Sequence, residues 1–277
     1  LVGSEMCIRD RQGGDMYNEN KLFAWTDSQG NKYNYGDMYT IPNNNTTLTA
    51  QWIAGNEVTV TNTLPTDSTV EFQSMSPSRC LIRYDDNEVV RRNTNAISTF
   101  KKNYSLGTHD TTIVSESDDL TNFDNAFDKG TTTKIDCSKV KATYLTSPMG
   151  NGFENITDFV FPANLANIST SEGVLSGCKK LTNIAFPTVY CDISSPESFL
   201  ANSTFVNGLE LPYTLNFVPM VSVDGQTGIE EIKRNEILKG SHVIGNLTIK
   251  AATTNKCVVY VLSLIHISEP TRQAEIS

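Results

Sequence analysis

A regular repeat dominates the second half of this sequence. Pro162, Pro187 and Pro212 are evenly spaced, and each ends a segment of one pattern: ITDFVFP (156–162), LTNIAFP (181–187) and VNGLELP (206–212). Proline ends strand pairing because it has no amide proton to donate. A fixed period of about 20 to 50 residues is the signature of repeats that stack on their neighbours. The sequence therefore predicts a mainly β chain that contains a solenoid with coils of about 25 residues.

The apolar pattern within each repeat assigns an inner and an outer side. We expect Ile156, Phe159, Phe161 and their equivalents in the next two repeats to point inward, because one coil cannot bury its apolar side alone. The residues between them form an outer strand face, on which equivalent positions of successive coils stack. Such an extended face suits a protein or glycan partner. The candidate binding residues are Asp158, Val160, Asn183, Ala185 and Glu210, although a merely solvated role stays open for each.

Further coils are expected on both sides of these three repeats. Residues 134–138 repeat the pattern one residue out of phase, and residues 246–249 repeat it after a longer insertion. The segment LSGCKKL at 175–181 resembles the Gly-Cys-x-x-Leu segment of BspA-like leucine-rich repeats, although Asn202-Ser203 replaces Gly-Cys in the next coil. This resemblance assigns residues 131–261 to a leucine-rich-repeat solenoid and implies a bacterial surface protein.

Residues 12–54 carry a different pattern. The runs FAWTDSQGNKYNYGD at 23–37 and LTAQW at 48–52 resemble the Listeria–Bacteroides repeat, a small β-grasp-like module of bacterial surface proteins. The opening strand of that module is missing before Gly13, so the resemblance implies a partial copy. We interpret Trp25 and Trp52 as core residues in preference to ligand-stacking residues.

Residues 55–130 predict short strands separated by polar turns. Segments rich in β-branched or aromatic residues occur at 58–60, 70–72, 81–84, 89–90 and 111–114. The acidic turn at 85–88, with the later run YSLGT at 104–108, gives a faint resemblance to PKD-like β-sandwich modules. Clustered carboxylates are calcium ligands, but we interpret Asp85, Asp86 and Glu88 as a solvated turn.

The two ends of the chain do not read as natural protein. DNA that encodes LVGSEMCIRDR at 1–11 encodes LSLIHISEPTR at 262–272 when its reverse complement is translated. This inverted element resembles the transposase adapter of sequencing libraries. We therefore set residues 1–11 and 262–277 aside as adapter-like, not native. The native part is then 12–261, which we expect to be a gene fragment cut at both ends.

Patterns that carry chemistry are missing from residues 12–261. Its histidines, His109 and His242, lie far apart, and it has no nucleophile elbow, phosphate-binding loop or His-Glu-x-x-His motif. Its five cysteines show no Cys-x-x-Cys spacing, and we expect Cys137 and Cys178 to be free core thiols. Residues 228–238 suit a short surface helix. We expect no enzyme, no cofactor and no metal site.

Charge limits the class of partner. Residues 12–261 hold 19 basic and 27 acidic residues, a net charge of −8 against −9 for the whole chain, which argues against nucleic acid. No stretch approaches the roughly 20 apolar residues of a membrane span. With the resemblance, this predicts an extracellular or cell-surface, adhesin-like fragment that binds a protein or glycan on a host or neighbouring cell. The alternative is a structural stalk or spacer that presents a domain lost by truncation, for example that of a carbohydrate-active enzyme.

Overall fold

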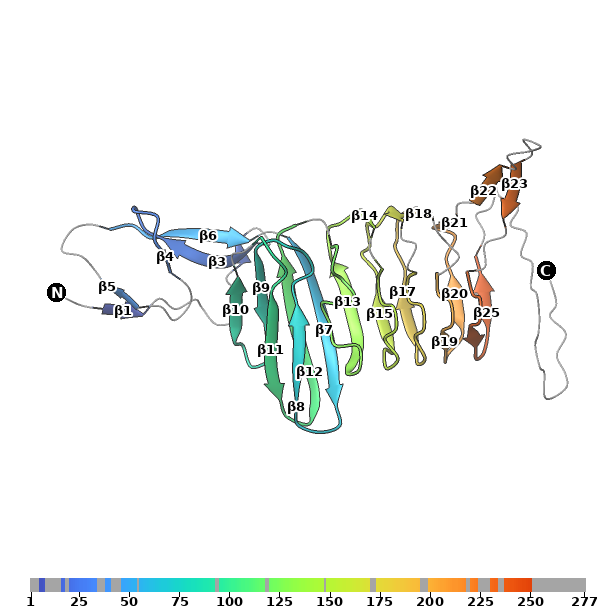
Figure 1. Ribbon diagram of the computed structural model, residues 1–277, viewed down its shortest axis with the longest axis horizontal. Coiled ribbons are helices and arrows are strands. Elements are labelled where there is room, and N and C mark those ends of the chain that lie inside the picture. Colours follow the sequence, from blue (N-terminus) through green and yellow to red (C-terminus); the bar gives the residue numbers. More distant parts are fainter. Residues whose placement is uncertain are drawn as a thin grey trace.

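The strands of the central region and of the coils that follow it lie side by side along one long axis, whereas the small N-terminal sheet lies along that axis (Figure 1). The computed structural model describes residues 5–7, 16–17, 20–33, 38–40, 46–53, 55–92, 95–117, 120–146, 148–169, 173–194, 199–217, 220–223, 230–233 and 237–250. Every regular element within these ranges is a β-strand, so the mainly β prediction is confirmed. In the same ranges, no helix is long and apolar enough to cross a membrane. The adapter-like residues 262–277 lie outside the described part.

The N-terminal strands form a small antiparallel sheet. Its strands are β2 (Met16–Tyr17), β3 (Asn20–Thr26), β4 (Lys32–Tyr33) and β6 (Thr49–Ile53), while β1 (Glu5–Cys7) pairs with β5 (Met38–Thr40). The expected turn at 27–31 is present, because Asp27 accepts hydrogen bonds from the backbone of Gln29 and Asn31. Trp25 and Trp52 are both half-buried. Phe23 and Ile53 pack against Leu81 and Val114, which joins this sheet to the next one.

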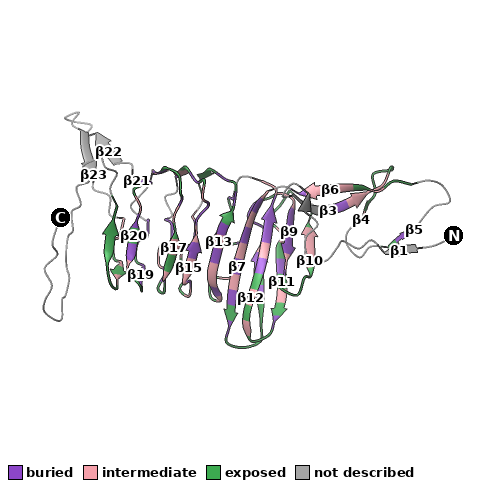
Figure 2. Cartoon of the chain, turned by 180° about the vertical axis from the view of Figure 1, so that it is seen from behind, coloured by how far each residue is buried: buried purple, intermediate pink, exposed green. Residues whose placement is uncertain are grey.

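The central region is a β-sandwich. One sheet contains β10 (Val89–Arg92), β9 (Cys80–Arg83), β12 (Gly107–Ser115) and β7 (Asn56–Leu64) in antiparallel order, and the facing pair is β8 (Ser68–Gln73) with β11 (Thr99–Tyr104). Buried residues alternate with more exposed ones along β7 (Figure 2), as expected for a strand with one core face. All five strand segments predicted for residues 55–130 lie within these elements or at their ends.

The same sheet continues without a break into the solenoid. The strand β13 (Thr132–Lys139) pairs antiparallel with β7 on one side and parallel with β15 (Asp158–Val160) on the other. β15 in turn pairs parallel with β17 (Asn183–Ala185), which completes a seven-stranded sheet. One hydrophobic core extends from Val58 in β7 to Leu215 in the third coil. The central sandwich therefore covers the first coil edge to edge and shares its core.

A second parallel ladder runs along the other side of the coils. It consists of β14 (Tyr144–Leu145), β16 (Asn167–Ile168), β18 (Cys191–Ile193) and β21 (Leu215–Phe217). Between the first and second repeats, both ladders pair residues one period apart, as Asn167 is with Asp192 and Asp158 with Asn183. This register confirms the predicted coil length. The out-of-phase coil is confirmed as well, because Lys134 pairs with Asp158, one position short of a full period.

Each coil contains one tight turn with left-handed backbone positions, two in each of the first three coils and one in the fourth. The first position is Gly150, Leu175 or Leu200, with φ of 79°, 50° and 57°. The second is Gly152, Gly177, Asn202 or Gly240, with φ of 72°, 75°, 55° and 68°. Asparagine tolerates this conformation better than other residues with a side chain. Asn202-Ser203 therefore makes the turn that Gly177-Cys178 makes one coil earlier, although the two pairs share no residue.

The fourth turn, at residues 237–241, explains where the regular period is lost. Ser241 occupies the position of Ser203 after an insertion, since its Oγ donates to Leu200 O as Ser203 Oγ donates to Leu175 O. The prediction of a helix at 228–238 is wrong: part of it is the strand β23 (Glu230–Lys233), paired antiparallel with β22 (Met220–Val223). The strand itself, EEIK, holds a single apolar residue, so it is too short for its apolar spacing to distinguish a strand from a helix.

The fourth coil begins after this turn. β24 (His242–Val243) pairs parallel with β19 (Thr204–Phe205), and β25 (Leu247–Ile249) pairs parallel with β20 (Leu209–Leu211). The strand predicted at 246–249 is thus confirmed. All three residues of β25 are exposed.

Candidate functional site

Four of the five predicted binding residues lie together on the outer face of the solenoid. Asp158 and Val160 of β15 are half-buried, and Asn183 and Ala185 of β17 are exposed. Asn183 pairs with Asp158, and Ala185 with Val160. Asn183 Nδ2 donates a hydrogen bond to Asp158 Oδ1 over 2.7 Å. These residues form a double row across two coils, in which Asp158 and Asn183 are the polar row and Val160 and Ala185 are the apolar row.

The fifth residue, Glu210, is separated from this row by a break in the sheet. The seven-stranded sheet ends at β17, and β20 pairs with β25 instead. The second and third coils are joined at one end of the break, where Val206 N donates to Leu181 O over 2.7 Å. They are joined again at the other end, where Thr214 Oγ1 donates to Pro187 O over 3.1 Å. Between these points, no hydrogen bond joins β17 to β20 in the described part of the chain.

An extra turn at Val206 and Asn207 causes the break. Leu181 is bridged to Phe205, whereas the regular repeat aligns it with Val206, the next position along the chain. The prediction that Val206 points inward is therefore wrong: Val206 is 41% exposed and Phe205 takes the buried position. Gly208 follows the turn at φ 85° and lies directly against Asn246 of the fourth coil. The turn thus draws β20 toward β25 and away from β17.

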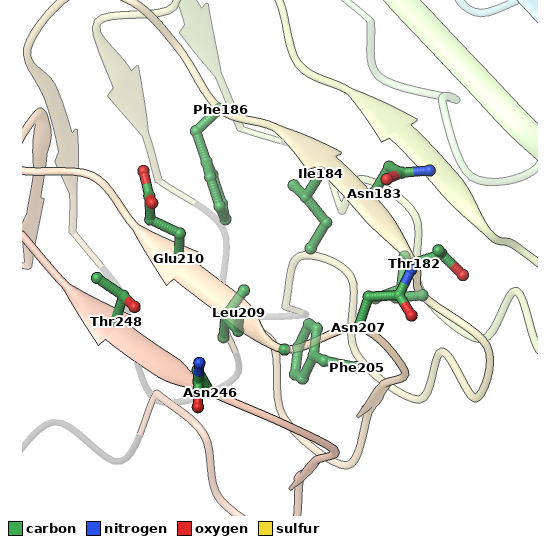
Figure 3. Close-up of a pocket in the computed structure, with 12 residues that line it drawn as sticks. Thr182, Asn183, Ile184, Phe186, Phe205, Asn207, Leu209, Glu210, Asn246 and Thr248 are labelled. Carbon is green, nitrogen blue, oxygen red and sulfur yellow. The ribbon is translucent and has the colours of Figure 1, made fainter. Parts of the chain in front are cut away.

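The break opens a pocket of about 370 Å³, which we call the β17–β20 slot (Figure 3). Its apolar lining is Leu181, Ile184, Phe186, Phe205 and Leu209. Its polar lining is Thr182, Asn183, Asn207, Glu210, Asn246 and Thr248, and Gly208 completes it. Ile184 and Phe186 lie on one side of the slot, and Leu209 and Glu210 lie on the other.

The slot exposes side chains that are covered one coil earlier. Phe159 and Phe161 of the first repeat are 0% and 2% exposed, whereas their equivalents Ile184 and Phe186 are only half-buried. Phe186 stacks on Phe161, with ring centroids 5.6 Å apart and planes 14° apart. One face of the Phe186 ring is therefore held by its neighbour, and the side chain points into the slot.

The slot has little net charge. Among the described residues that line it, Glu210 is the only charged one, and its carboxylate lies 2.5 Å from Lys250 Nζ. Both side chains of this pair are about half exposed, so the pair is screened by water and sits at the rim. A ligand in the slot meets amides, hydroxyls and an apolar floor.

The acidic turn at 85–88 is held by cations of the same chain. Lys102 Nζ binds the carboxylates of Asp86 and Glu88, and His109 Nδ1 lies 2.6 Å from Asp85 Oδ2. The hydrogen bond from Lys102 holds the pKa of Asp86 below its ordinary value. Burial lowers the pKa of His109, but its hydrogen bonds to Asp85 and to Ser105 O outweigh this and raise it. No group of three or more metal-ligating side chains is brought together among the residues that the structure describes.

Four cysteines are made unreactive by burial in the core. Cys80, Cys137, Cys178 and Cys191 are free and buried, which confirms the prediction for Cys137 and Cys178. Burial raises the pKa of Cys80 and Cys191 to about 11 and that of Cys178 to about 12. Thiols with such pKa values carry almost no thiolate near neutral pH, so they are poor nucleophiles.

Comparison with known proteins adds nothing to this geometry. No family model, curated protein or solved structure matches the chain. The candidate site is therefore defined by the geometry and side-chain chemistry of two features of the solenoid. They are the double row Asp158, Val160, Asn183 and Ala185, and the slot that separates this row from Glu210.

Proposed function

We propose that this chain is the non-catalytic binding part of a secreted bacterial surface protein. It binds a protein or glycan on a host or neighbouring cell through the outer face of β15 and β17 and the adjoining slot. The resemblance of residues 175–181 to BspA-like repeats and of residues 23–52 to the Listeria–Bacteroides repeat supports an extracellular location. Stacked coils give a rigid surface that is wider than any one repeat, as binding solenoids require.

The observation that carries this proposal is the register of the outer face. Asp158 and Asn183 stack one coil apart and are linked by a hydrogen bond, so their positions are fixed before a partner arrives. Groups that are already ordered lose less conformational entropy on binding. The rim carboxylate of Glu210 extends the polar surface across the slot.

The test replaces Asp158, Asn183 and Glu210 together by alanine. The whole chain and the variant are fluorescently labelled, and their binding to panels of bacterial and epithelial cells is measured by flow cytometry. We expect the triple variant to lose about tenfold or more in affinity. A matched variant replaces Asp192 and Asn216 on the other ladder, which are also linked by a hydrogen bond, and should bind as the parent does.

Unchanged binding of the triple variant, with its β circular dichroism intact, would contradict the proposal. Binding that is absent from the parent chain on every cell type would contradict it too. Either result favours the stalk, in which the repeats serve only to hold another domain away from the cell.

A further inference from the structure

The β17–β20 slot has the shape of a site for one compact ligand. Its volume of about 370 Å³ is at the lower end of the range for small-molecule sites, which starts near 300 Å³. Hydrogen bonds join the second and third coils on either side of it, from Val206 N to Leu181 O and from Thr214 Oγ1 to Pro187 O. An extended peptide that completed the ladder would have to run past both of these hydrogen bonds. A ring that enters from the outer face need not disturb them.

The edges of the slot offer both donors and acceptors from the backbone. Asn183 N donates to Thr157 O, and Ala185 O accepts from Phe161 N, so these two residues of β17 face β15. Because alternate residues of a strand face opposite neighbours, the backbone groups of Ile184 face the slot. Leu209 N donates to Asn246 O and Leu211 O accepts from Lys250 N, so these two residues bond to the fourth coil. The backbone groups of Glu210, which lies between them, therefore face the slot.

The side chains add the same mixture. Asn207, Asn246 and Thr248 carry amides and a hydroxyl, each of which can donate and accept. The floor is apolar, and the partly exposed Phe186 ring points into the slot. Glu210 is already paired with Lys250, so the slot makes no demand for a charged ligand. A suitable ligand is neutral, has hydroxyls along its edge and has one apolar face.

We propose that the β17–β20 slot binds a single neutral sugar ring of a glycan. The C–H face of the ring packs on Phe186 and Ile184, and its hydroxyls bond to Asn207, to Glu210 and to the backbone edge of Ile184. This assignment rests on the proposed binding function and names its ligand class. It also gives a role to the turn at Val206 and Asn207, because that turn opens the sheet.

The experiment titrates the full chain with glucose, galactose, mannose, N-acetylglucosamine and N-acetylgalactosamine. Binding is followed by saturation-transfer difference NMR and by chemical-shift titration of the protein. At least one sugar should bind saturably. Phe186→Ala and Phe186→Leu should both weaken that sugar about tenfold. Phe186→Leu keeps an apolar side chain but removes the ring, so it separates loss of the ring face from loss of folding.

The matched control is Phe217→Ala. Phe217 is also a half-buried phenylalanine at the end of a solenoid strand, and its ring lies 5.5 Å from that of Phe199, outside the slot. It should change sugar affinity by no more than about twofold. No binding of any of the five sugars, or equal effects of Phe186→Leu and Phe217→Ala, would overturn the proposal.

The cell-binding assay separates this proposal from the broader one. If no sugar binds but the Asp158, Asn183 and Glu210 variant loses cell binding, the sugar assignment fails and the binding function stands. If Phe186→Ala also loses cell binding in that case, the slot takes an apolar side chain of a protein partner. If a sugar binds but the triple variant retains cell binding, the slot is a sugar site and the proposed binding of cells through the outer face of β15 and β17 fails.

Discussion

Ser203 Oγ donates a hydrogen bond to the carbonyl oxygen of Leu175 over 2.6 Å and accepts one from Cys178 N over 3.1 Å. This single buried hydroxyl ties the turn of the third coil to that of the second. One coil earlier, Cys178 Sγ makes the equivalent of the first of these hydrogen bonds, because it donates to Gly150 O over 3.1 Å. The tight turns are thus linked along the solenoid by small donor side chains at one repeated position.

Ser203→Ala should destabilise the chain by about 1 to 3 kcal/mol, because it leaves a buried N–H and a buried C=O without partners. Ser203→Cys should cost clearly less, since a cysteine already bonds in this way at position 178. Urea unfolding followed by circular dichroism measures both. A loss below about 0.5 kcal/mol for Ser203→Ala would show that water replaces the hydroxyl.

Alanine at Gly177 and at Gly208 should differ in cost. Both positions have positive φ, 75° and 85°, so each substitution incurs the left-handed penalty of about 1 to 2 kcal/mol. A Cβ at Gly177 meets nothing closer than 3.7 Å, whereas one at Gly208 would lie 2.6 Å from Asn246 O. Gly208→Ala should therefore be the more damaging change by thermal unfolding. Equal melting temperatures would argue against close packing of the third and fourth coils.

His109 should make the stability of the central sandwich depend on pH. Its pKa is raised in the folded chain, so its stabilising contribution is complete below its ordinary pKa of 6.5 and is lost as pH rises through the folded value. The His109 ring also stacks on the Tyr104 ring, with the two ring centroids 4.3 Å apart. Measured across this pH range, the free energies of unfolding of the parent and of Asp85→Asn should differ at the low end and become equal at the high end. A constant difference would contradict the role of the Asp85 carboxylate.

The four buried cysteines, Cys80, Cys137, Cys178 and Cys191, should be unreactive in the folded chain. In a variant with Cys7 and Cys257 replaced by serine, Ellman's reagent at about pH 8 should find almost no thiol before unfolding and four after it. The raised pKa values and the burial of all four side chains are the reason. Rapid reaction of one thiol in the native protein would reveal local opening of the strand or coil that holds it.

The sequence was informative where one period governs the packing. Ile156, Phe159 and Phe161 are all buried as predicted. The reason is that the register of the strand fixes which of its side chains face the core. The same rule placed Asp158 and Asn183 on the outside, one above the other.

The slot could not be predicted, because its cause is a local shift of the chain by one position. The apolar pattern fits Val206 to the period, but Phe205 beside it is larger and takes the buried position. The turn at 237–241 was missed for a related reason. Its residues ILKGS match VLSGC at 174–178 in character, yet the insertion before it removes the regular spacing by which the repeats are found.

The strands of the solenoid lie across the long axis of the chain, which matters for a protein held under tension (Figure 1). A force along that axis acts across these strands, so it breaks the hydrogen bonds of the parallel ladders one after another instead of shearing many together. The paired strands β7 and β12 are loaded in the same direction, but they are backed by the sandwich core. Between the second and third coils no ladder joins β17 to β20, and the strand pairing continues only on the other side, between β18 and β21. We expect mechanical load to widen the slot on this unpaired side first, while the ladder of β18 and β21 still holds the second and third coils together.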